Sequence, residues 1–178
     1  SFATAGAVPA NNIARWDGAW HPYGTGMDGP VFALAAPPSG QIIAGGSFTI
    51  AGWGTVYRIA AWYGQQWHAM GGGSGPAVQS LTVLANGEVV AVGGLSLPGG
   101  AGGSTIARWN GVDWFAIPGS FLGTVREIAV LANGDLVAAG QYSRINGTIF
   151  GNIARWDGTT WNAMGTGVNG AVESLAVQ

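Results

Sequence analysis

One spacing constrains the fold of this chain more than any other feature: a tryptophan recurs every 47 residues, at Trp20, Trp67, Trp114 and Trp161. A valine follows each of these tryptophans by eleven residues, at Val31, Val78, Val125 and Val172. A second tryptophan precedes each of them, at Trp16, Trp62, Trp109 and Trp156. A fixed period of this length indicates a repeat architecture. We therefore interpret residues 1–178 as a single propeller or propeller fragment with units at 1–46, 47–94, 95–140 and 141–178, the last one incomplete.

Each unit contains short apolar runs separated by tight turns, which indicates strands rather than helices. Turn pairs between the first two strands, A and B, stand at Ser39-Gly40, Asn86-Gly87 and Asn133-Gly134. Pairs between strands C and D stand at Asp17-Gly18, Tyr63-Gly64, Asn110-Gly111 and Asp157-Gly158. Such pairs tolerate the positive φ that two-residue hairpin turns require. Four antiparallel strands per period predict an all-β fold, a β-propeller with about four four-stranded blades per chain.

Three segments resemble the kelch repeat, in which a hydrophobic strand ends in a double glycine and is followed by an aromatic strand and a tryptophan after a tight turn. They are Leu84–Gly94, Leu131–Gly140 and Ile153–Trp161. Kelch-like propellers include the galactose-oxidase enzymes as well as many binding scaffolds. Those oxidases depend on a tyrosine cross-linked to a cysteine and on copper held by histidines and tyrosines. The chain has no cysteine and only two histidines, so that activity is excluded and no cofactor is expected.

The strand count bears on how such a propeller would close. Ser1-Phe2 is expected to end a strand B, and Ala171–Gln178 is expected to form a lone strand A, so that the two termini pair. The counterpart of Leu131–Gly140 is then missing from one unit. Three arrangements remain open: a ring closed with a defective blade, a larger ring completed by a second chain, or a fragment of a longer array.

Composition excludes several classes of function. Charged residues make up 8% of the chain, all six basic residues are arginine, and the formal net charge is −2, so nucleic-acid binding is not expected. No apolar run reaches the roughly 18 residues that a membrane-spanning helix needs. Apolar residues make up 48%, enough to form a packed core. Low charge with abundant glycine, alanine and tryptophan favours an extracellular or cell-surface protein.

The repeated side chains have a structural and a functional interpretation. We interpret the periodic tryptophans as the packing element between blades; the alternative is a set of sugar-stacking platforms. Arg15, Arg108 and Arg155 share one repeat position. We expect them to bond carbonyls or the acid two residues on, which is Asp17 or Asp157; the alternative is an anion-binding ring.

No constellation of catalytic or metal-ligating residues is evident. His21 and His68 lie on different units and lack a third ligand, so no metal site is expected. The eight acids are scattered or recur at turns, which argues against a catalytic carboxylate pair. The sequence therefore predicts that the chain is not an enzyme.

Candidate binding residues lie where the units differ. Strands that alternate in direction place the loops after strands B and D on one face, and the variable B–C loops are Thr49–Tyr57, Ser96–Thr105 and Ser143–Asn152. Candidate ligand-binding residues on these loops are Trp53, Tyr57, Arg144, Asn146 and Phe150. Trp53 is the one tryptophan outside the periodic pattern, and the alternative is that it folds back over a blade edge.

These observations favour a non-enzymatic binding or adhesion scaffold that engages glycans or another protein through the face of the B–C and D–A loops. The alternative is an architectural repeat module that self-assembles into a larger ring or array as a homo-oligomer. A hydrolase or oxidoreductase that uses a central channel has no supporting residues.

Overall fold

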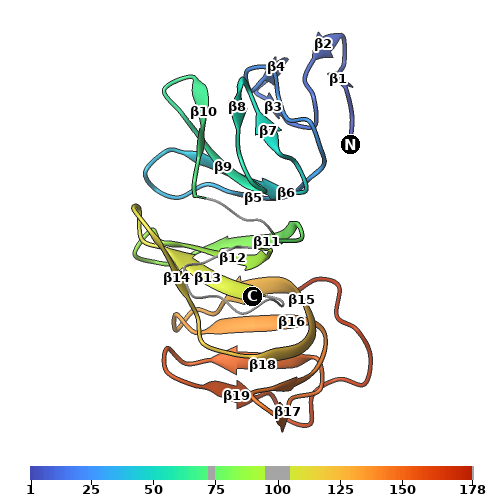
Figure 1. Cartoon of the computed structure of the whole chain (residues 1–178), viewed down its shortest axis with the longest axis vertical. Helices are drawn as coiled ribbons and strands as arrows, with labels where there is room; N and C mark the ends of the chain where they lie inside the picture. Colours follow the sequence, from blue (N-terminus) through green and yellow to red (C-terminus); the bar gives the residue numbers. More distant parts are fainter. Residues whose placement is uncertain (72–74, 95–104, 178) are drawn as a thin grey trace.

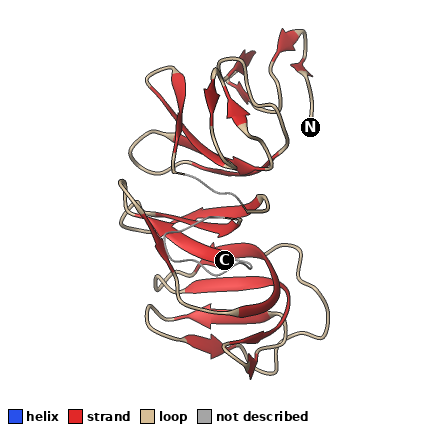
Figure 2. Cartoon of the chain, in the orientation of Figure 1, coloured by secondary structure: helices blue, strands red, loops and turns tan. Residues whose placement is uncertain are grey.

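The computed structural model describes residues 1–71, 75–94 and 105–177 (Figures 1 and 2). Within these ranges the regular secondary structure consists of β-strands, with no helix. No helix long and apolar enough to cross a membrane occurs in them. Three antiparallel sheets each contain four strands in chain order, as the turn pairs predict. The prediction of an all-β fold made of several antiparallel sheets is confirmed.

We name these three sheets in chain order. Sheet I consists of β5 (Val31–Ala35), β6 (Ile42–Gly46), β9 (Ile59–Tyr63) and β10 (Gln66–Ala69). Sheet II consists of β11 (Val78–Val83), β12 (Val89–Gly93), β13 (Thr105–Trp109) and β14 (Trp114–Ala116). Sheet III contains β15 (Phe121–Val130), β16 (Leu136–Ile145), β18 (Ile153–Trp156) and β19 (Trp161–Ala163), and a short fifth strand, β17 (Thr148–Ile149), pairs with the end of β16. The first unit contributes a separate hairpin, β3 (Ala14–Trp16) with β4 (Trp20–Pro22).

The A–B turns have the backbone geometry that their sequence predicts. Gly87 and Gly134 have φ of +86° and +90°, values that residues with a Cβ adopt rarely. The preceding asparagines accept hydrogen bonds from the amides of Glu88 and Asp135, both at 3.1 Å. These local contacts set the register in which strand A pairs with strand B.

The core lies between the sheets, because successive residues of one strand face different neighbours. In β12, Val89 and Ala91 pack in the cluster between sheets I and II. Val90 and Val92 pack in the cluster between sheets II and III. Sheet II is therefore buried on both faces, and β11 contacts both β5 and β15.

The strand-D tryptophans link each sheet to the preceding unit. Nε1 of Trp67 donates to the carbonyl oxygen of Tyr23 at 3.0 Å, Nε1 of Trp114 to Met70 at 2.5 Å, and Nε1 of Trp161 to Pro118 at 2.7 Å. Each ring also lies 5.3 Å, between centroids, from the strand-C tryptophan of its own hairpin. These contacts support the packing interpretation of the periodic tryptophans.

The two strands expected at the chain ends do not form. Ser1-Phe2 lies outside any strand, and residues 171–177 contain none, while Gln178 lies outside the described residues. In sheets I to III each strand A pairs with the strand B that follows it in sequence, and residues 171–177 have no such partner in the described ranges. No strand pair there joins the two termini, which lie apart in Figure 1. The predicted pairing of the termini is therefore not observed.

Three short hairpins occupy B–C loops, where the sequence predicts no strands. They are β1 (Thr4–Ala5) with β2 (Val8–Pro9), β7 (Ile50–Ala51) with β8 (Gly54–Thr55), and the end of β16 with β17 (Thr148–Ile149). The two variable loops that lie within the described residues, Thr49–Tyr57 and Ser143–Asn152, thus contain hairpins.

Candidate functional site

The B–C loops share one design. Residues 2–12, 48–58 and 142–152 each close with a backbone hydrogen bond from the last residue to the first. The distances are 2.8 Å for Asn12 to Phe2, 3.1 Å for Arg58 to Phe48 and 3.1 Å for Asn152 to Tyr142. The three loops have the same length and the same closing hydrogen bond, so their residues can be compared position by position. Most of the Ser96–Thr105 loop, residues 96–104, lies outside the described residues.

The last residue of each loop ties the loop to the neighbouring D–A segment. Asn152 has φ of +65°, a left-handed conformation that asparagine tolerates well. Its Oδ1 accepts from the amide of Tyr142, and its Nδ2 donates to the carbonyl of Val168, both at 3.0 Å. Asn12 makes the same pair of bonds in the first loop. In the second loop Arg58 holds this position, with φ of +69°.

Trp53 lies at the tip of the β7–β8 hairpin and is 93% exposed. The alternative that Trp53 folds back over a sheet edge is therefore wrong. The segment before the tip is held from the side by the D–A segment: Gly52 donates its amide to the carbonyl of Gly26 at 2.8 Å, and the hydroxyl of Thr25 donates to the carbonyl of Gly52 at 3.0 Å. Tyr57, in the same loop, is 49% exposed. The hairpin therefore presents an exposed tryptophan on a fixed base.

Asp28 also holds this base, through its carboxylate. Its Oδ1 accepts from the amides of Thr49 and Ile50 at 2.7 and 2.8 Å, and its Oδ2 accepts from the hydroxyl of Thr49 at 2.7 Å. Burial of the carboxylate raises its pKa, but the bonds from Thr49 and Ile50 outweigh that effect, so the pKa of Asp28 lies below its usual range. Sequence reasoning did not single out this residue.

We expect an Asp28→Asn variant to be less stable than the wild type near neutral pH, with a difference that narrows as the pH falls below about 4. A carboxyl group whose pKa is lower in the folded than in the unfolded state contributes stability above the unfolded pKa. That contribution is lost as the pH falls through the folded pKa. Denaturant midpoints of both proteins across the acid range check this.

The matched control is Asp113→Asn, because within the described ranges the Asp113 carboxylate accepts no hydrogen bond and forms no ion pair. A stability difference between wild type and Asp28→Asn that stays constant on acidification would contradict the role given to the charge.

The other predicted site residues form a separate group. Arg144 is exposed and donates to the carbonyl of Gly147 at 2.7 Å, across its own hairpin. Asn146 accepts from the amide of Ser120 at 2.9 Å, so it joins its loop to a D–A segment. Phe150 is 9% exposed and belongs to the core between sheets II and III, so it is not available as a surface anchor. The hairpins that carry Trp53 and Arg144 belong to opposite ends of the stack of sheets in Figure 1. The five residues therefore do not form one site.

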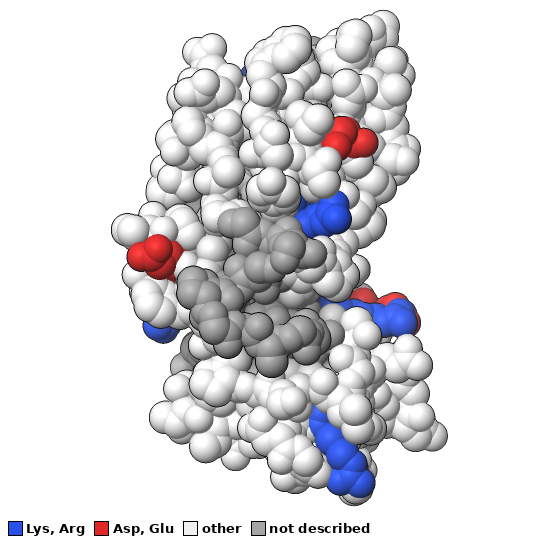
Figure 3. All heavy atoms as spheres, in the orientation of Figure 1, with Lys and Arg blue, Asp and Glu red and all other residues white. Residues whose placement is uncertain are grey.

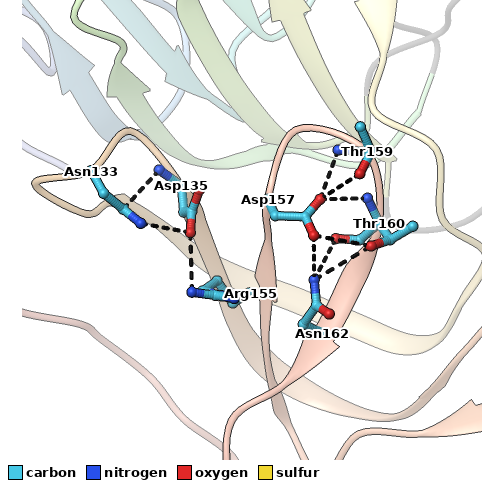
Figure 4. Close-up of polar contacts among 7 residues, drawn as sticks. All are labelled: Asn133, Asp135, Arg155, Asp157, Thr159, Thr160 and Asn162. Atoms are coloured by element: carbon cyan, nitrogen blue, oxygen red, sulfur yellow. Dashed lines mark hydrogen bonds and ion pairs between the residues drawn. The ribbon is translucent and has the colours of Figure 1, made fainter.

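The opposite face carries the short A–B and C–D turns. Its charged side chains form ion pairs and hydrogen bonds with nearby residues of the same sheet. The sequence suggested that Arg155 bonds carbonyls or Asp157. In the structure Arg155 instead pairs with Asp135 at 3.2 Å (Figure 4). Asp157 instead accepts hydrogen bonds from Thr159, Thr160 and Asn162 at 2.8 to 3.1 Å. Led by the amide of Thr160 and the hydroxyl of Thr159, these bonds lower the pKa of Asp157.

The remaining arginines of this position also form ion pairs. Arg15 pairs with Asp17, as predicted, and Arg108 pairs with Glu88 at 3.3 Å. Figure 3 shows that charged groups are few and scattered on the face it presents. No group of three or more His, Cys, Asp or Glu side chains suited to a metal ion occurs in the described parts of the chain.

No known family model matches the chain, and no curated protein matches it.

Proposed function

We propose that the chain is a kelch-like β-propeller, or a portion of one, that acts as a non-enzymatic binding scaffold outside the cell or at its surface. Three consecutive sheets, each with an A-B-C-D set of strands in chain order and with neighbouring A strands, support the propeller. In this proposal the B–C hairpins present the binding residues and the sheets hold them in place.

The observation that carries the proposal is the exposure of Trp53, at 93%. A tryptophan left in water at the tip of a braced hairpin has a large apolar surface to bury in a partner. Small-molecule sites are concave, whereas a side chain this exposed forms a projection, so its complement is a pocket on another macromolecule. We therefore infer a protein partner, with Trp53 as the anchor and Tyr57 beside it in sequence.

The test begins with a photo-crosslinking amino acid at position 53, which identifies what contacts the hairpin tip. The dissociation constant of the identified protein is then measured with wild type, Trp53→Ala and Trp16→Ala. Trp16 is the matched control because it is also exposed, at 61%, but lies on β3. Loss of at least about 30-fold in affinity with Trp53→Ala alone would support the proposal.

Equal affinities of the three proteins, or the absence of a discrete crosslinked partner, would contradict it. Binding of the wild type to a glycan array, lost with Trp53→Ala, would assign the hairpin to carbohydrate instead.

A second candidate function is self-assembly, and exposure at the two ends of the array favours it. Trp20 is 41% exposed whereas its counterpart Trp67 is 8% exposed. Met164 is 38% exposed whereas its counterpart Met70 is 4% exposed. A further unit of the same kind would cover both surfaces. Light scattering gives the mass in solution: a stable oligomer that Trp20→Arg dissociates would favour this function, and a monomer at all concentrations would exclude it.

A further inference from the structure

A pocket of about 280 Å³ lies between sheets I and II, on the face of the short turns. Sheet I contributes Ala61, Tyr63 and His68 to its lining, sheet II contributes Trp109, and the turn after Trp109 contributes Asn110. This face lies at the other end of the strands from the hairpin that carries Trp53, so the pocket is separate from the surface discussed above.

The pocket repeats between sheets II and III, but with different side chains. The second pocket is lined by residues 47 positions further on, which include Arg108, Phe115 and Trp156. Arg108 stands where the first pocket has Ala61, and Phe115 stands where it has His68. The first pocket therefore has alanine and histidine where the second has arginine and phenylalanine.

The turn residue explains why His68 differs from its counterparts. In β3–β4, His21 bonds to Asp17 at 2.9 Å, and in β18–β19, Asn162 donates to Asp157 at 2.8 Å (Figure 4). The counterpart of these aspartates in sheet I is Tyr63.

Tyr63 stacks on the ring of His68, with centroids 3.8 Å apart and planes 10° apart, but it does not bond to the ring nitrogen. Nε2 of His68 is consequently a buried polar atom without a hydrogen-bond partner in the described parts of the chain. A buried polar atom in this condition is costly, and a ligand that bonds to it removes the cost. Tyr63 is 46% exposed, so its ring has room to shift as a ligand enters.

The rest of the lining defines the chemistry of that ligand. Neutral polar groups come from Ser39, Gln41 and Asn86. The charged side chain in the lining is Glu88, whose carboxylate is balanced by Arg108 at 3.3 Å. Aromatic rings of Tyr63 and Trp109 offer apolar faces. Such a lining suits a ring that carries hydroxyl groups at its edge, apolar C–H groups on its faces and no net charge.

We propose that this pocket binds a single neutral sugar ring, with one of its hydroxyl groups bonded to His68. Because a ligand of this size makes few contacts, the dissociation constant is expected on the order of 1 mM.

The test titrates the whole chain with glucose, galactose, mannose and N-acetylglucosamine, and in separate arms with glucosamine and glucuronic acid. Intrinsic tryptophan fluorescence reports on Trp109, and ligand-observed NMR measures binding directly. Binding of at least one neutral sugar is expected. No binding of any neutral sugar up to about 100 mM would overturn the proposal, as would binding of the charged sugars alone.

Two variants locate the binding. Ala61→Arg and His68→Phe each install the residue of the next pocket, so both substitutions introduce side chains that this repeat already accommodates. Each is expected to weaken binding at least about tenfold, while circular dichroism and melting confirm that the proteins remain folded. The controls are His21→Phe, which removes the histidine that already bonds to Asp17, and Trp53→Ala, on the other face. Unchanged affinity in both pocket variants, or equal loss in the controls, would overturn the proposal.

Discussion

A Trp114→Ala variant is expected to lose about 3–5 kcal/mol of the free energy of unfolding. The ring of Trp114 packs against the core between sheets I and II. Its Nε1 donates to the carbonyl of Met70 at 2.5 Å, so truncation also leaves that carbonyl without its partner. Trp109, at 5.3 Å between centroids, loses its neighbour as well. The loss is thus a cavity, a hydrogen bond and an aromatic contact in one place, and equilibrium unfolding in denaturant measures it.

The matched control is Trp20→Ala, which removes the same side chain at the same repeat position. Trp20 is 41% exposed and has no sheet on its outer side in the described parts of the chain, so its truncation is expected to cost far less. A Trp114→Phe variant separates the hydrogen bond from the packing. Equal losses at positions 20 and 114 would contradict the assignment of Trp114 as the link between two sheets.

The second large effect is expected for Gly140→Ala, which should lose roughly 3 kcal/mol or more. A Cβ at position 140 would lie 2.3 Å from the carbonyl oxygen of Thr124 and 2.9 Å from Cα of Val125, both in the neighbouring strand. These atoms belong to the backbone of β15, which is irregular between Val125 and Glu127, so a shift would break the pairing of β15 with β16. Thermal and denaturant unfolding measure the loss.

Gly46 and Gly93 show that the close approach of strand A to a glycine of strand B recurs in each repeat. A Cβ there would lie 2.1 Å from the carbonyl oxygen of Pro30 and 2.2 Å from that of Ala77, at the corresponding irregularities. Gly170→Ala is the control, because no atom lies within 4 Å of a Cβ at that position. Wild-type stability of Gly140→Ala would show that β15 adjusts without cost, and would contradict the close approach as the reason for glycine.

Local features of the fold follow from short stretches of sequence. Two-residue pairs that end in glycine set the turns, and the short apolar runs between them form the strands of sheets I to III in the predicted order. Both depend on residues a few positions apart, so the spacing alone identifies them. The B–C hairpins were missed because their sequences share little beyond length, although Asn12 and Asn152 at the same loop position were a usable signal.

The candidate site could be predicted only in part. Trp53 stood out because it breaks the repeat, and it is the most exposed of the large apolar side chains in the described ranges. Phe150 was predicted because it lies on the corresponding variable loop, but its loop position corresponds to Val56, which is 2% exposed, so the position faces the core. An alignment of residues 48–58 with 142–152 would have distinguished the exposed position of Trp53 from the core position of Phe150.

The 47-residue period, the turns and the order of strands within each sheet were determined by the sequence itself, because they arise from neighbouring residues and recur in every copy. The tertiary structure decided everything that depends on a partner distant in the chain. Residues 171–177 match the other A strands in sequence but form no strand, since pairing needs a strand B beside them. Ala61, Tyr63 and His68 each differ from the residue at the same position of another unit, but no one of these differences indicates a site. Only the packing of sheet I on sheet II brings the three residues to one pocket. Contacts between sheets depend on which surfaces meet, and a local pattern does not contain that information.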